Sequence, residues 1–538
     1  MGKLAGLSQF VSLLVIALFS FAAVSFAQST RGELAGSITD ASGAVISGAQ
    51  IVAVNSDTGA KSQTTSTSSG AYHFTELSIG RYSVTVTAPG FSVSTSNGVQ
   101  VTVNSTSSLN VVLKAGAVSE SVTVDASGAR IETESSDIGG TISARQITEL
   151  PLAIAGGVGA LRSPENFAFL VPGTTGPGAG GPTGLNGNGV FFAKLGGGQS
   201  FGAEVLLDGA SITRSENGSS FDETSPSVEA LQEFKVTTAT PVAEFGRTTG
   251  GTESFVTKGG TNQYHGTAFD IFINDALNSN GWFEHGLRNQ CDPTDTACLN
   301  KYRTAVNRKN DYGGSFGGPL RIPHLYNGTD RTFFFFSWEQ YRQTLSAISQ
   351  ATVPTTTGGT TGQGQRGGDF SAVLGGPTPV INPCTGQPVL QNQIFDPDTT
   401  SSAITATNPT GIPCRLPFAG NIIPQTRFSP AALKLTAALP APNQAATLNA
   451  PYGFFNNYSN RGSFPILNTT QTIRVDQSIT QKSKIWASYS VRDNNRTSVD
   501  NLPPPLSGNV PQDFNTHYVR AGWDYTLTPN LLNHINLG

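Results

Sequence analysis

The stretch KSKIWASYSVRD, residues 482–493, decides how the second half of the chain is organised, because its side chains alternate in character. Successive residues of a strand point to opposite faces of a sheet. One face carries Ile485, Ala487, Tyr489 and Val491, and the other carries Trp486, Ser488, Ser490 and Arg492. This alternation over about ten residues is typical of a strand that crosses an outer membrane, with lipid on one side and water on the other. The stretch therefore predicts a membrane-spanning β-strand.

The same alternation recurs in QTIRVDQSI, residues 471–479, and in HYVRAGWDYTL, residues 517–527. We expect strands near residues 265–274, 310–320, 331–342, 470–479, 484–493, 516–527 and 531–538. Their connections are alternately long and short, as in barrels with long outer loops and short periplasmic turns. The second outer loop, about 343–469, is rich in Thr, Pro, Gly and Asn. It could gate the barrel or contact a ligand, or it could be a partly disordered surface loop.

Composition excludes several classes of protein. Charged residues make up 13% of the 538, against roughly 25% in an average soluble protein, and the formal net charge is -4. The chain therefore lacks the basic field that attracts nucleic acid. Beyond the N-terminus, no segment has the roughly 20 apolar residues that a membrane-spanning helix needs. An extracellular or outer-membrane β-protein fits this composition.

The N-terminal stretch MGKLAGLSQFVSLLVIALFSFAAVSFAQS, residues 1–29, has the parts of a secretory signal peptide. Lys3 supplies a positive charge, an apolar run follows, and Ser25-Phe26-Ala27 is a small-x-small cleavage pattern. We assign residues 1–27 to the signal peptide. The alternative is a membrane anchor, for which the apolar run is short.

The four cysteines, Cys291, Cys298, Cys384 and Cys414, all lie in the first and second predicted outer loops. Export places them in an oxidising space, where disulfides form. Four cysteines allow three connectivities, and we favour the local pairs, Cys291 with Cys298 and Cys384 with Cys414. A zinc site is the alternative, but the spacing does not fit paired CxxC motifs.

Sequence motifs for cofactor or metal binding are either absent or lack the flanking structure that they need. GPGAGG, residues 176–181, formally fits GxGxxG, but no helix is expected to open after it, so a dinucleotide site is not predicted. The six histidines show no ligand spacing. We therefore expect no enzyme, no cofactor and no metal site.

Residues 28–116 predict a small all-β domain, because short alternating strands, such as the one through Tyr82, Val84 and Val86, are separated by glycine turns. The elements GSITDASGAVISGAQIVAV, SGAYHFTEL and GRYSVTVTAPGF resemble the carboxypeptidase regulatory-like domain, a β-sandwich with a carbohydrate-binding-like fold. That domain is an accessory, so the resemblance implies no peptidase chemistry.

A linker is predicted over residues 117–130, and it contains the segment ESVTVDA. Its residues are Glu120, Ser121, Val122, Thr123, Val124, Asp125 and Ala126. Such a segment can add as a strand to the edge of a partner's sheet, and it resembles the TonB box of outer-membrane transporters. The alternative is a last strand of the preceding sandwich, and the residues alone favour neither.

Residues 131–262 mix short strands with glycine-rich loops. In SPSVEALQEFKVTTA we expect a short helix that is capped by Ser227 and carries Val228, Leu231 and Phe234 on one face, followed by a strand. The order DG, VEALQEFKV, AEFGRTTGG and VTKGGTNQYHG strongly resembles the plug domain of TonB-dependent receptors, most closely the Oar-like group. The resemblance is carried by Asp208, Gly209, Glu233, Phe245, Gly246, Arg247, Gly250, Gly251, Gly259 and Gly260. Because it lies just ahead of this plug, ESVTVDA gains support as a TonB box.

Taken together, these resemblances imply a mainly β fold: a small β-sandwich, then an α+β plug domain, then an incomplete antiparallel transmembrane β-barrel over residues 263–538. The family has many more strands than seven, and the chain stops apparently inside a strand, so we expect a truncated barrel. In RTFFFFSWEQYR, residues 331–342, Phe334, Phe336 and Trp338 are then expected to face lipid. Phe333 and Phe335 are expected to face inward, where they could pack on the plug.

The resemblance implies a receptor or transporter in the outer membrane of a Gram-negative cell, with its regulatory-like domain in the periplasm. It would bind an unidentified extracellular ligand and import or export it. The energy would come through TonB and its inner-membrane energising complex, and outer-membrane lipid would surround the barrel. The alternative is an adhesin or structural surface protein that kept the plug without transport.

Overall fold

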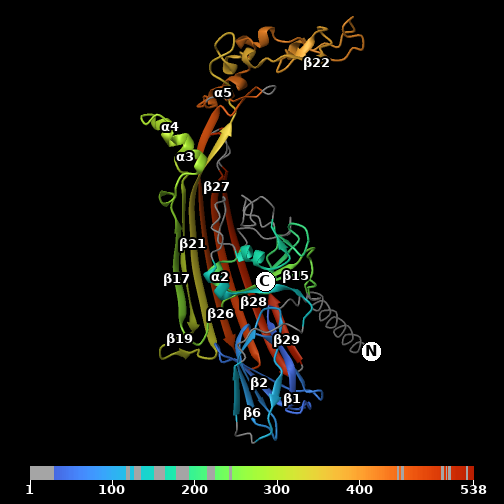
Figure 1. Cartoon of the computed structure of the whole chain (residues 1–538), viewed down its shortest axis with the longest axis vertical. Coiled ribbons are helices and arrows are strands. Elements are labelled where there is room, and N and C mark those ends of the chain that lie inside the picture. The colour runs from blue at the N-terminus through green and yellow to red at the C-terminus, as the bar shows by residue number, and fades with distance from the viewer. Residues whose placement is uncertain are drawn as a thin grey trace, which may run out of the picture.

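The structure is a computed structural model. It describes residues 30–116, 121–125, 135–150, 164–176, 193–214, 225–241, 245–444, 447–449, 453–498, 502–503, 506, 510–528 and 531–538. The predicted signal peptide lies outside these residues. A small domain (30–125) forms the lower end of the molecule, and a middle domain (135–257) lies beside one face of a tall antiparallel sheet (Figure 1). Long loops rise from the upper end of that sheet (Figure 1).

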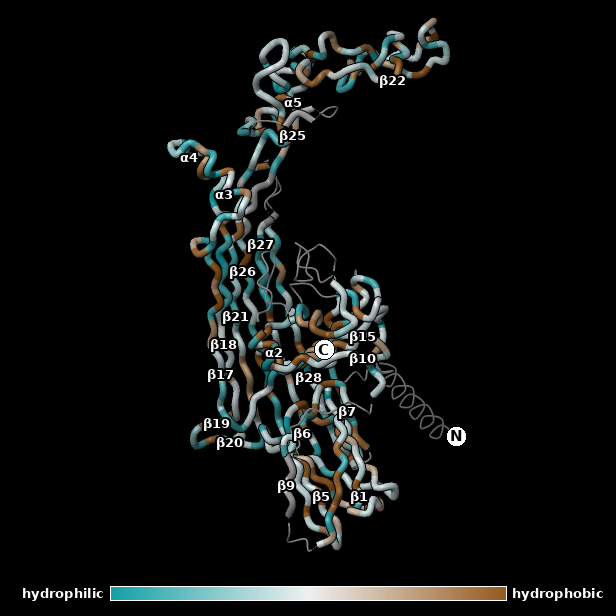
Figure 2. The backbone as a smooth tube through the Cα atoms, viewed as in Figure 1, coloured by the Kyte–Doolittle hydropathy of each residue, from teal (hydrophilic) through white to brown (hydrophobic). Residues whose placement is uncertain are grey.

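The small domain is a β-sandwich, as predicted. One sheet has the strand order β4-β1-β7, with β8 beside β1, and the other has the order β3-β2-β5-β6-β9. The strands are β1 (Gly32–Asp40), β2 (Gln50–Asn55), β3 (Lys61–Thr65), β4 (Ala71–Leu77), β5 (Gly80–Thr87), β6 (Val93–Val101), β7 (Thr106–Ser108), β8 (Val111–Leu113) and β9 (Ser121–Asp125). Alternate apolar residues such as Val84 and Val86 are buried between the sheets, and hydrophobic positions follow β1 and β5 (Figure 2).

The middle domain is built on a five-stranded sheet with the order β10-β15-β16-β13-β14. Its elements are β10 (Ile138–Ser143), α2 (Ala144–Glu149), η1 (Pro164–Leu170), β11 (Thr174–Thr175), β12 (Lys194–Leu195), β13 (Glu204–Leu207), β14 (Ala210–Ser211), η2 (Val228–Ala230), β15 (Leu231–Ala239) and β16 (Thr252–Thr257). Ser143 and Gln146 form a capping box that starts α2. In the core, the rings of Phe234 and Phe255 stack with their centroids 4.8 Å apart.

The helix expected after Ser227 is only a single 3-10 turn, η2, although Ser227 does cap it by accepting a hydrogen bond from the N–H of Glu229. Leu231 and Phe234 lie in strand β15 and not on a helix, so that part of the prediction is wrong. The physical reason is that β15 pairs with β10 on one side and β16 on the other. Main-chain pairing on both sides outweighs a short helical spacing.

The tall sheet contains seven strands, each paired in antiparallel order with its neighbours in the chain. They are β17 (His265–Ile273), β18 (Asn307–Pro319), β21 (Thr332–Ala351), β26 (Tyr458–Ser478), β27 (Ser483–Ser498), β28 (Val510–Thr528) and β29 (Leu531–Leu537). All the strands expected in this part of the chain are therefore present, and several are longer than predicted.

The two faces of the tall sheet differ as the alternation predicts; we call the face toward the middle domain the inner face. In β27, Trp486 and Arg492 are buried on the inner face, whereas Ile485 and Tyr489 are 40% and 41% exposed on the outer face. In the FFFF stretch of β21, Phe333 and Phe335 are buried on the inner face, and Phe336 is exposed on the outer face.

The second long loop is shorter than expected: it covers residues 352–457, not 343–469. Strands β21 and β26 stay paired from Thr332 with Gln477 to Ala351 with Tyr458. Beyond Arg342 the side chains no longer alternate between apolar and polar, but main-chain hydrogen bonds extend a ladder without requiring an apolar face. Hydrophobic patterning therefore underestimates the strand length.

Short elements occupy the connections of the tall sheet. They are η3 (Asp275–Leu277), α3 (Trp282–Arg288), α4 (Thr296–Lys301), β19 (Arg321–Ile322), β20 (Tyr326–Asn327), η4 (Gln365–Gly367), η5 (Ser371–Val373), β22 (Pro377–Ile381), β23 (Pro388–Leu390), η6 (Pro397–Thr399), η7 (Ala419–Asn421), η8 (Gln425–Arg427), α5 (Pro430–Ala438), β24 (Thr447–Asn449) and β25 (Gly453–Phe455). Across the part of the chain that the structure describes, no helix has the length and apolar character needed to cross a membrane.

Replacing Phe255 by Ala removes the ring that stacks on Phe234 in the fully buried centre of the middle domain. We expect a loss of about 3–5 kcal/mol in the free energy of unfolding, because a cavity remains. Denaturant unfolding with hydrogen exchange of residues 231–257 measures this loss. Phe272→Ala is the matched control, since Phe272 is 62% exposed; equal destabilisation by both variants would contradict the assigned core.

Candidate functional site

A tight hairpin lies at the centre of the contact between the middle domain and the tall sheet. Asp208 and Gly209 join β13 to β14 with backbone φ angles of 49° and 83°. Positive φ at both central positions is the geometry of a type I′ turn, which favours Asp-Gly. The turn holds the buried Asp208 side chain beside β16. There, its two carboxylate oxygens accept hydrogen bonds from the N–H of Thr257 at 2.9 Å and from its hydroxyl at 2.8 Å.

Arg474, on the inner face of β26, reaches the same carboxylate. Its Nη1 lies 3.3 Å from Oδ1 of Asp208 and donates to the Thr257 hydroxyl at 2.8 Å. Its Nε donates to Oδ2 of Asp476 at 3.0 Å, and the guanidinium lies over the ring of Trp486, 4.6 Å from the centroid. A buried cation between two carboxylates keeps its charge compensated. Arg474 therefore links the tall sheet to the hairpin.

Hydrogen bonds to the middle domain come from six strands of the tall sheet: β17, β21, β26, β27, β28 and β29. Besides Arg474, the contacts are Thr267 to Glu229, Ser227 to Glu339, Arg492 to the carbonyl of Ser225, Arg520 to the carbonyl of Leu207, and Asn536 to the carbonyl of Asp208. The middle domain is thus held across the width of the inner face. Sequence reasoning assigned none of these tall-sheet residues a contact with the middle domain, although the places of Arg474, Arg492 and Arg520 on the polar side of the alternation were an available signal.

The chain leaves the middle domain through Gly259 and Gly260, close against the inner face. A Cβ on Gly260 would lie 2.4 Å from the carbonyl oxygen of Phe334 and 2.9 Å from Cβ of Phe333. A Cβ on Gly259 would lie 3.0 Å from a carboxylate oxygen of Asp476. A side chain at position 260 would clash with this backbone, and Phe333 packs beside Gly260.

Two further glycines of the predicted plug motif, Gly250 and Gly251, allow close packing within the middle domain. A Cβ on Gly250 would lie 2.8 Å from the carbonyl oxygen of Leu195, and one on Gly251 would lie 2.2 Å from that of Thr237. Phe245 is buried, whereas Gly246 and Arg247 are exposed in the same loop. The structure therefore gathers Asp208, Gly259 and Gly260 at the inner face and places the other motif residues elsewhere in the domain.

Glu233, on β15, ties the middle domain to the sandwich. Its carboxylate accepts a hydrogen bond from the N–H of Val103. Nearby, Lys235 donates to the carbonyl of Asn104 at 2.7 Å and pairs with Asp137 at 2.5 Å. Burial raises the pKa of the Glu233 carboxyl to about 7. The protonation state of this carboxyl is therefore coupled to the joint between the two domains.

Five residues of the predicted TonB box form a strand. Ser121–Asp125 is β9, which pairs in parallel with β6 at the edge of the sandwich, from Val93 with Ser121 to Asn97 with Asp125. Glu120 and Ala126 lie outside the described residues. The pairing matches the alternative of a last sandwich strand, and it leaves the TonB-box interpretation open, because a docked strand can still be released to a partner.

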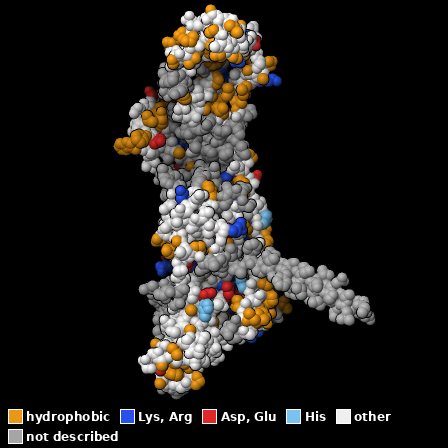
Figure 3. Space-filling view, turned by 90° about the vertical axis from the view of Figure 1, so that its right-hand side faces the viewer, with side chains coloured by type: hydrophobic (Ala, Val, Ile, Leu, Met, Phe, Trp, Pro, Cys, Tyr) orange, Lys and Arg blue, Asp and Glu red, His pale blue; other side chains and the backbone are white. Residues whose placement is uncertain are grey.

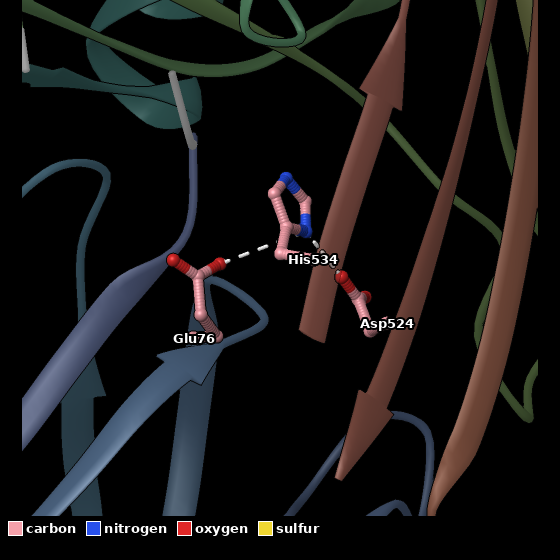
Figure 4. A group of neighbouring side chains, drawn as sticks. All are labelled: Glu76, Asp524 and His534. Carbon is pink, nitrogen blue, oxygen red and sulfur yellow. Dashed lines mark hydrogen bonds and ion pairs between the residues drawn. The ribbon is translucent and has the colours of Figure 1, made fainter. Parts of the chain in front are cut away.

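Glu76, Asp524 and His534 meet where the sandwich contacts β28 and β29 (Figure 4). Nδ1 of His534 lies 2.5 Å from Oδ1 of Asp524 and 3.9 Å from Oε2 of Glu76. In the space-filling view, acidic and histidine side chains lie near one another in the lower part of the molecule (Figure 3). Among the described residues these three groups could hold a metal ion. However, Asp524 also pairs with Arg31, so the cluster is accounted for as an ion-pair joint between the domains.

The cysteines are joined in two local pairs, Cys291 with Cys298 and Cys384 with Cys414, with Cα–Cα distances of 5.7 and 5.5 Å. These are the pairs that the sequence analysis favours. The first bond joins the segment just after α3 to α4, and the second joins residues 30 positions apart within the 352–457 loop.

Replacing Arg474 by Met leaves Asp208 buried without its cation. We expect a loss of about 3–5 kcal/mol, as is found when one partner of a buried ion pair is removed, measured as faster hydrogen exchange of residues 204–212. Arg145→Met is the control, since that side chain is 82% exposed. Adding Asp208→Asn to Arg474→Met should recover part of the loss, because the two effects are coupled; fully additive losses would contradict the pairing.

The joint at Glu233 should depend on pH. The pKa is raised from 4.5 to about 7 in the folded chain, so the folded joint retains a proton that the unfolded chain releases. The stabilisation is therefore complete below about pH 4.5 and is lost as the pH rises through 7, a change on the order of a few kcal/mol. Glu233→Gln should flatten this dependence in thermal unfolding between pH 5 and 8. Glu149→Gln, at a 60% exposed side chain, should not change it; a slope unaffected by Glu233→Gln would refute the assignment.

Comparison with known proteins identifies two regions of the chain. Residues 256–538 match the family model described as outer membrane beta barrel domain, and residues 33–114 match the carboxypeptidase regulatory-like domain. The TonB-dependent transporter Oar of Myxococcus xanthus is 26% identical over 344 residues, which cover 62% of this chain and 29% of the transporter. The chain thus spans less than a third of the length of that curated relative.

Two solved structures align with the chain at low identity. The outer membrane transporter YddB of Escherichia coli is 11% identical with a TM-score of 0.37, covering 72% of this chain and 36% of that one. The ferric enterobactin receptor of Pseudomonas aeruginosa is 10% identical with a TM-score of 0.34, covering 72% of this chain and 38% of that one. The family model carries the assignment instead: because its match covers more than half of the chain, this protein belongs to the outer membrane beta barrel domain family.

Proposed function

We propose that this chain is part of a TonB-dependent transporter of the outer membrane, in which the middle domain is the plug of the barrel. The observation that supports this most directly is the set of hydrogen bonds from six strands of the tall sheet to the middle domain. A wall that faced an open water channel would not present Phe333 against the backbone at Gly260. The likeness to the Oar transporter agrees with this assignment.

In this proposal the outer face of the tall sheet, with Ile485 and Tyr489, contacts lipid. The sandwich lies in the periplasm, and the loops that carry the two disulfides lie outside the cell. These loops and the outer side of the plug bind the extracellular ligand.

Energy would enter through residues 120–126. TonB binds this segment as an added strand and transmits energy from the inner-membrane complex to the plug. Movement of the plug requires the contacts of Arg474, Arg492 and Arg520 to break, so ligand and TonB must each bind one state of the plug better than the other.

A second candidate is an adhesin or structural surface protein that kept the plug without transport. The 352–457 loop with its disulfide between Cys384 and Cys414 favours it, because a long, covalently braced outer loop suits surface contact as well as ligand capture.

Deleting residues 120–126 from the full-length protein separates the two candidates. For a transporter, the deletion should reproduce the growth defects of the whole-gene deletion on ferric siderophores, glycan fragments or peptides, while surface display stays intact. Thr123→Ser is the matched control and should grow normally. If the gene deletion alters surface adhesion and the 120–126 deletion has no effect on growth or uptake, the adhesin is correct and transport is refuted.

A further inference from the structure

The edge of β6 is covered by a strand that does not belong to the regulatory-like domain. The domain match ends at residue 114, whereas β9 comprises Ser121–Asp125. In the described sheet, β6 has β5 on one side and β9 on the other, and β9 is the outermost strand. Without β9, the β6 backbone from Val93 to Asn97 would form an open sheet edge, which readily accepts an extended segment.

Backbone contacts of the residues just before β9 position it beside this edge. An isolated bridge pairs Phe91 with Ala115, and the N–H of Gly116 donates to the carbonyl of Gly90 at 3.3 Å. The segment therefore starts beside the first residue of β6, and both strands run away from that point in parallel. Four residues separate Gly116 from β9, so docking is intramolecular and proceeds at a high effective concentration.

The register pairs alternate positions of the segment with buried positions of β6. Positions 122 and 124 pair with Ser94 and Ser96, which are 7% and 5% exposed. Thr123 pairs with Thr95 and is exposed. Docking on β6 thus occupies one backbone edge of the segment.

We infer that the β6 edge is a receptor for the TonB box and keeps it masked, so that TonB must compete with the regulatory-like domain for residues 121–125. This inference rests on the proposed function. In this inference the sandwich regulates TonB binding. Only molecules in which the strand is undocked can bind TonB, so the apparent affinity falls in proportion to their fraction. A tenfold excess of the docked form lowers that affinity about tenfold.

A disulfide staple tests the masking directly. Thr95→Cys with Thr123→Cys joins register partners on neighbouring strands, where the strand spacing of about 4.8 Å suits a disulfide. In the full-length protein in detergent, the oxidised staple should weaken binding of the purified TonB C-terminal domain by at least about tenfold, and reduction should restore it. Gln50→Cys with Thr65→Cys, which staples the exposed partners on β2 and β3, should have no effect. Thr95→Cys alone controls for reduction of the native disulfides.

Two substitutions of Asn97 should shift the docking of residues 121–125 in opposite directions, without a covalent bond. Asn97 is exposed and is the register partner of Asp125. Asn97→Asp sets two like charges opposite each other and should release the strand, and Asn97→Lys should hold it, because opposite charges across strands attract. Hydrogen exchange of residues 121–125 should rise in the first variant and fall in the second, with TonB affinity changing in the same order.

The outcomes separate the inference from the function on which it rests. If the unmodified protein binds the TonB domain and the oxidised Thr95–Thr123 staple leaves that affinity unchanged or higher, the masking is refuted and the proposed function stands. If deletion of residues 120–126 leaves both TonB binding and uptake intact, the segment is not the TonB box and the masking is refuted, whereas transport stands. If the unmodified protein does not bind the TonB domain and deletion of the whole gene changes no uptake, the proposed function fails, and the masking fails with it.

Discussion

The contact between Arg474 and Asp208 constrains how the rest of the structure can be assembled. It joins residues 266 positions apart in the chain, and both partners are buried, so neither charge tolerates the loss of the other. Asp208 reaches its place only through a turn with positive φ, and Arg474 reaches its place only if β26 presents it on the inner face. A slip of β26 by one residue would turn Arg474 toward the outer face and bring Ile473 or Val475 inward. Pairing of Arg474 with Asp208 therefore requires both the alternation of the tall sheet and the Asp-Gly turn of the middle domain.

The need to place Asp208 and Arg474 together explains which features of the fold could be predicted from the sequence. Alternation along single strands located all seven strands of the tall sheet and both sets of faces, because different surroundings on the two faces of a sheet dictate residue type at every second position. The turn at Asp208 and Gly209 was equally visible, since positive φ restricts the choice of residue. These signals are local, and each is contained within about ten residues.

The partners of the wall residues were not visible, because they depend on the juxtaposition of distant segments. Nothing near Arg520 in the sequence indicates that it binds the carbonyl of Leu207, and nothing near Glu233 indicates that it meets Val103. Strand ends were also misjudged where polar sequence continued the ladder, as between Arg342 and Ala351 in β21. The segment at 121–125 could not be resolved between a sandwich strand and a TonB box for a deeper reason: the same backbone geometry serves both.

The strand order of the middle domain has a mechanical consequence. Its sheet runs β10-β15-β16-β13-β14. The hairpin edge is held to the tall sheet through Asp208 and Arg474, while the opposite edge, β10, is the first strand of the domain after the predicted linker that contains residues 120–126. Under the proposed function, a pull on the linker loads β10 first and reaches the fastened hairpin last. Under that function, a small force would separate β10 from β15 first, while the hairpin at Asp208 stays attached to β26, and β10 would pair again when the load is removed.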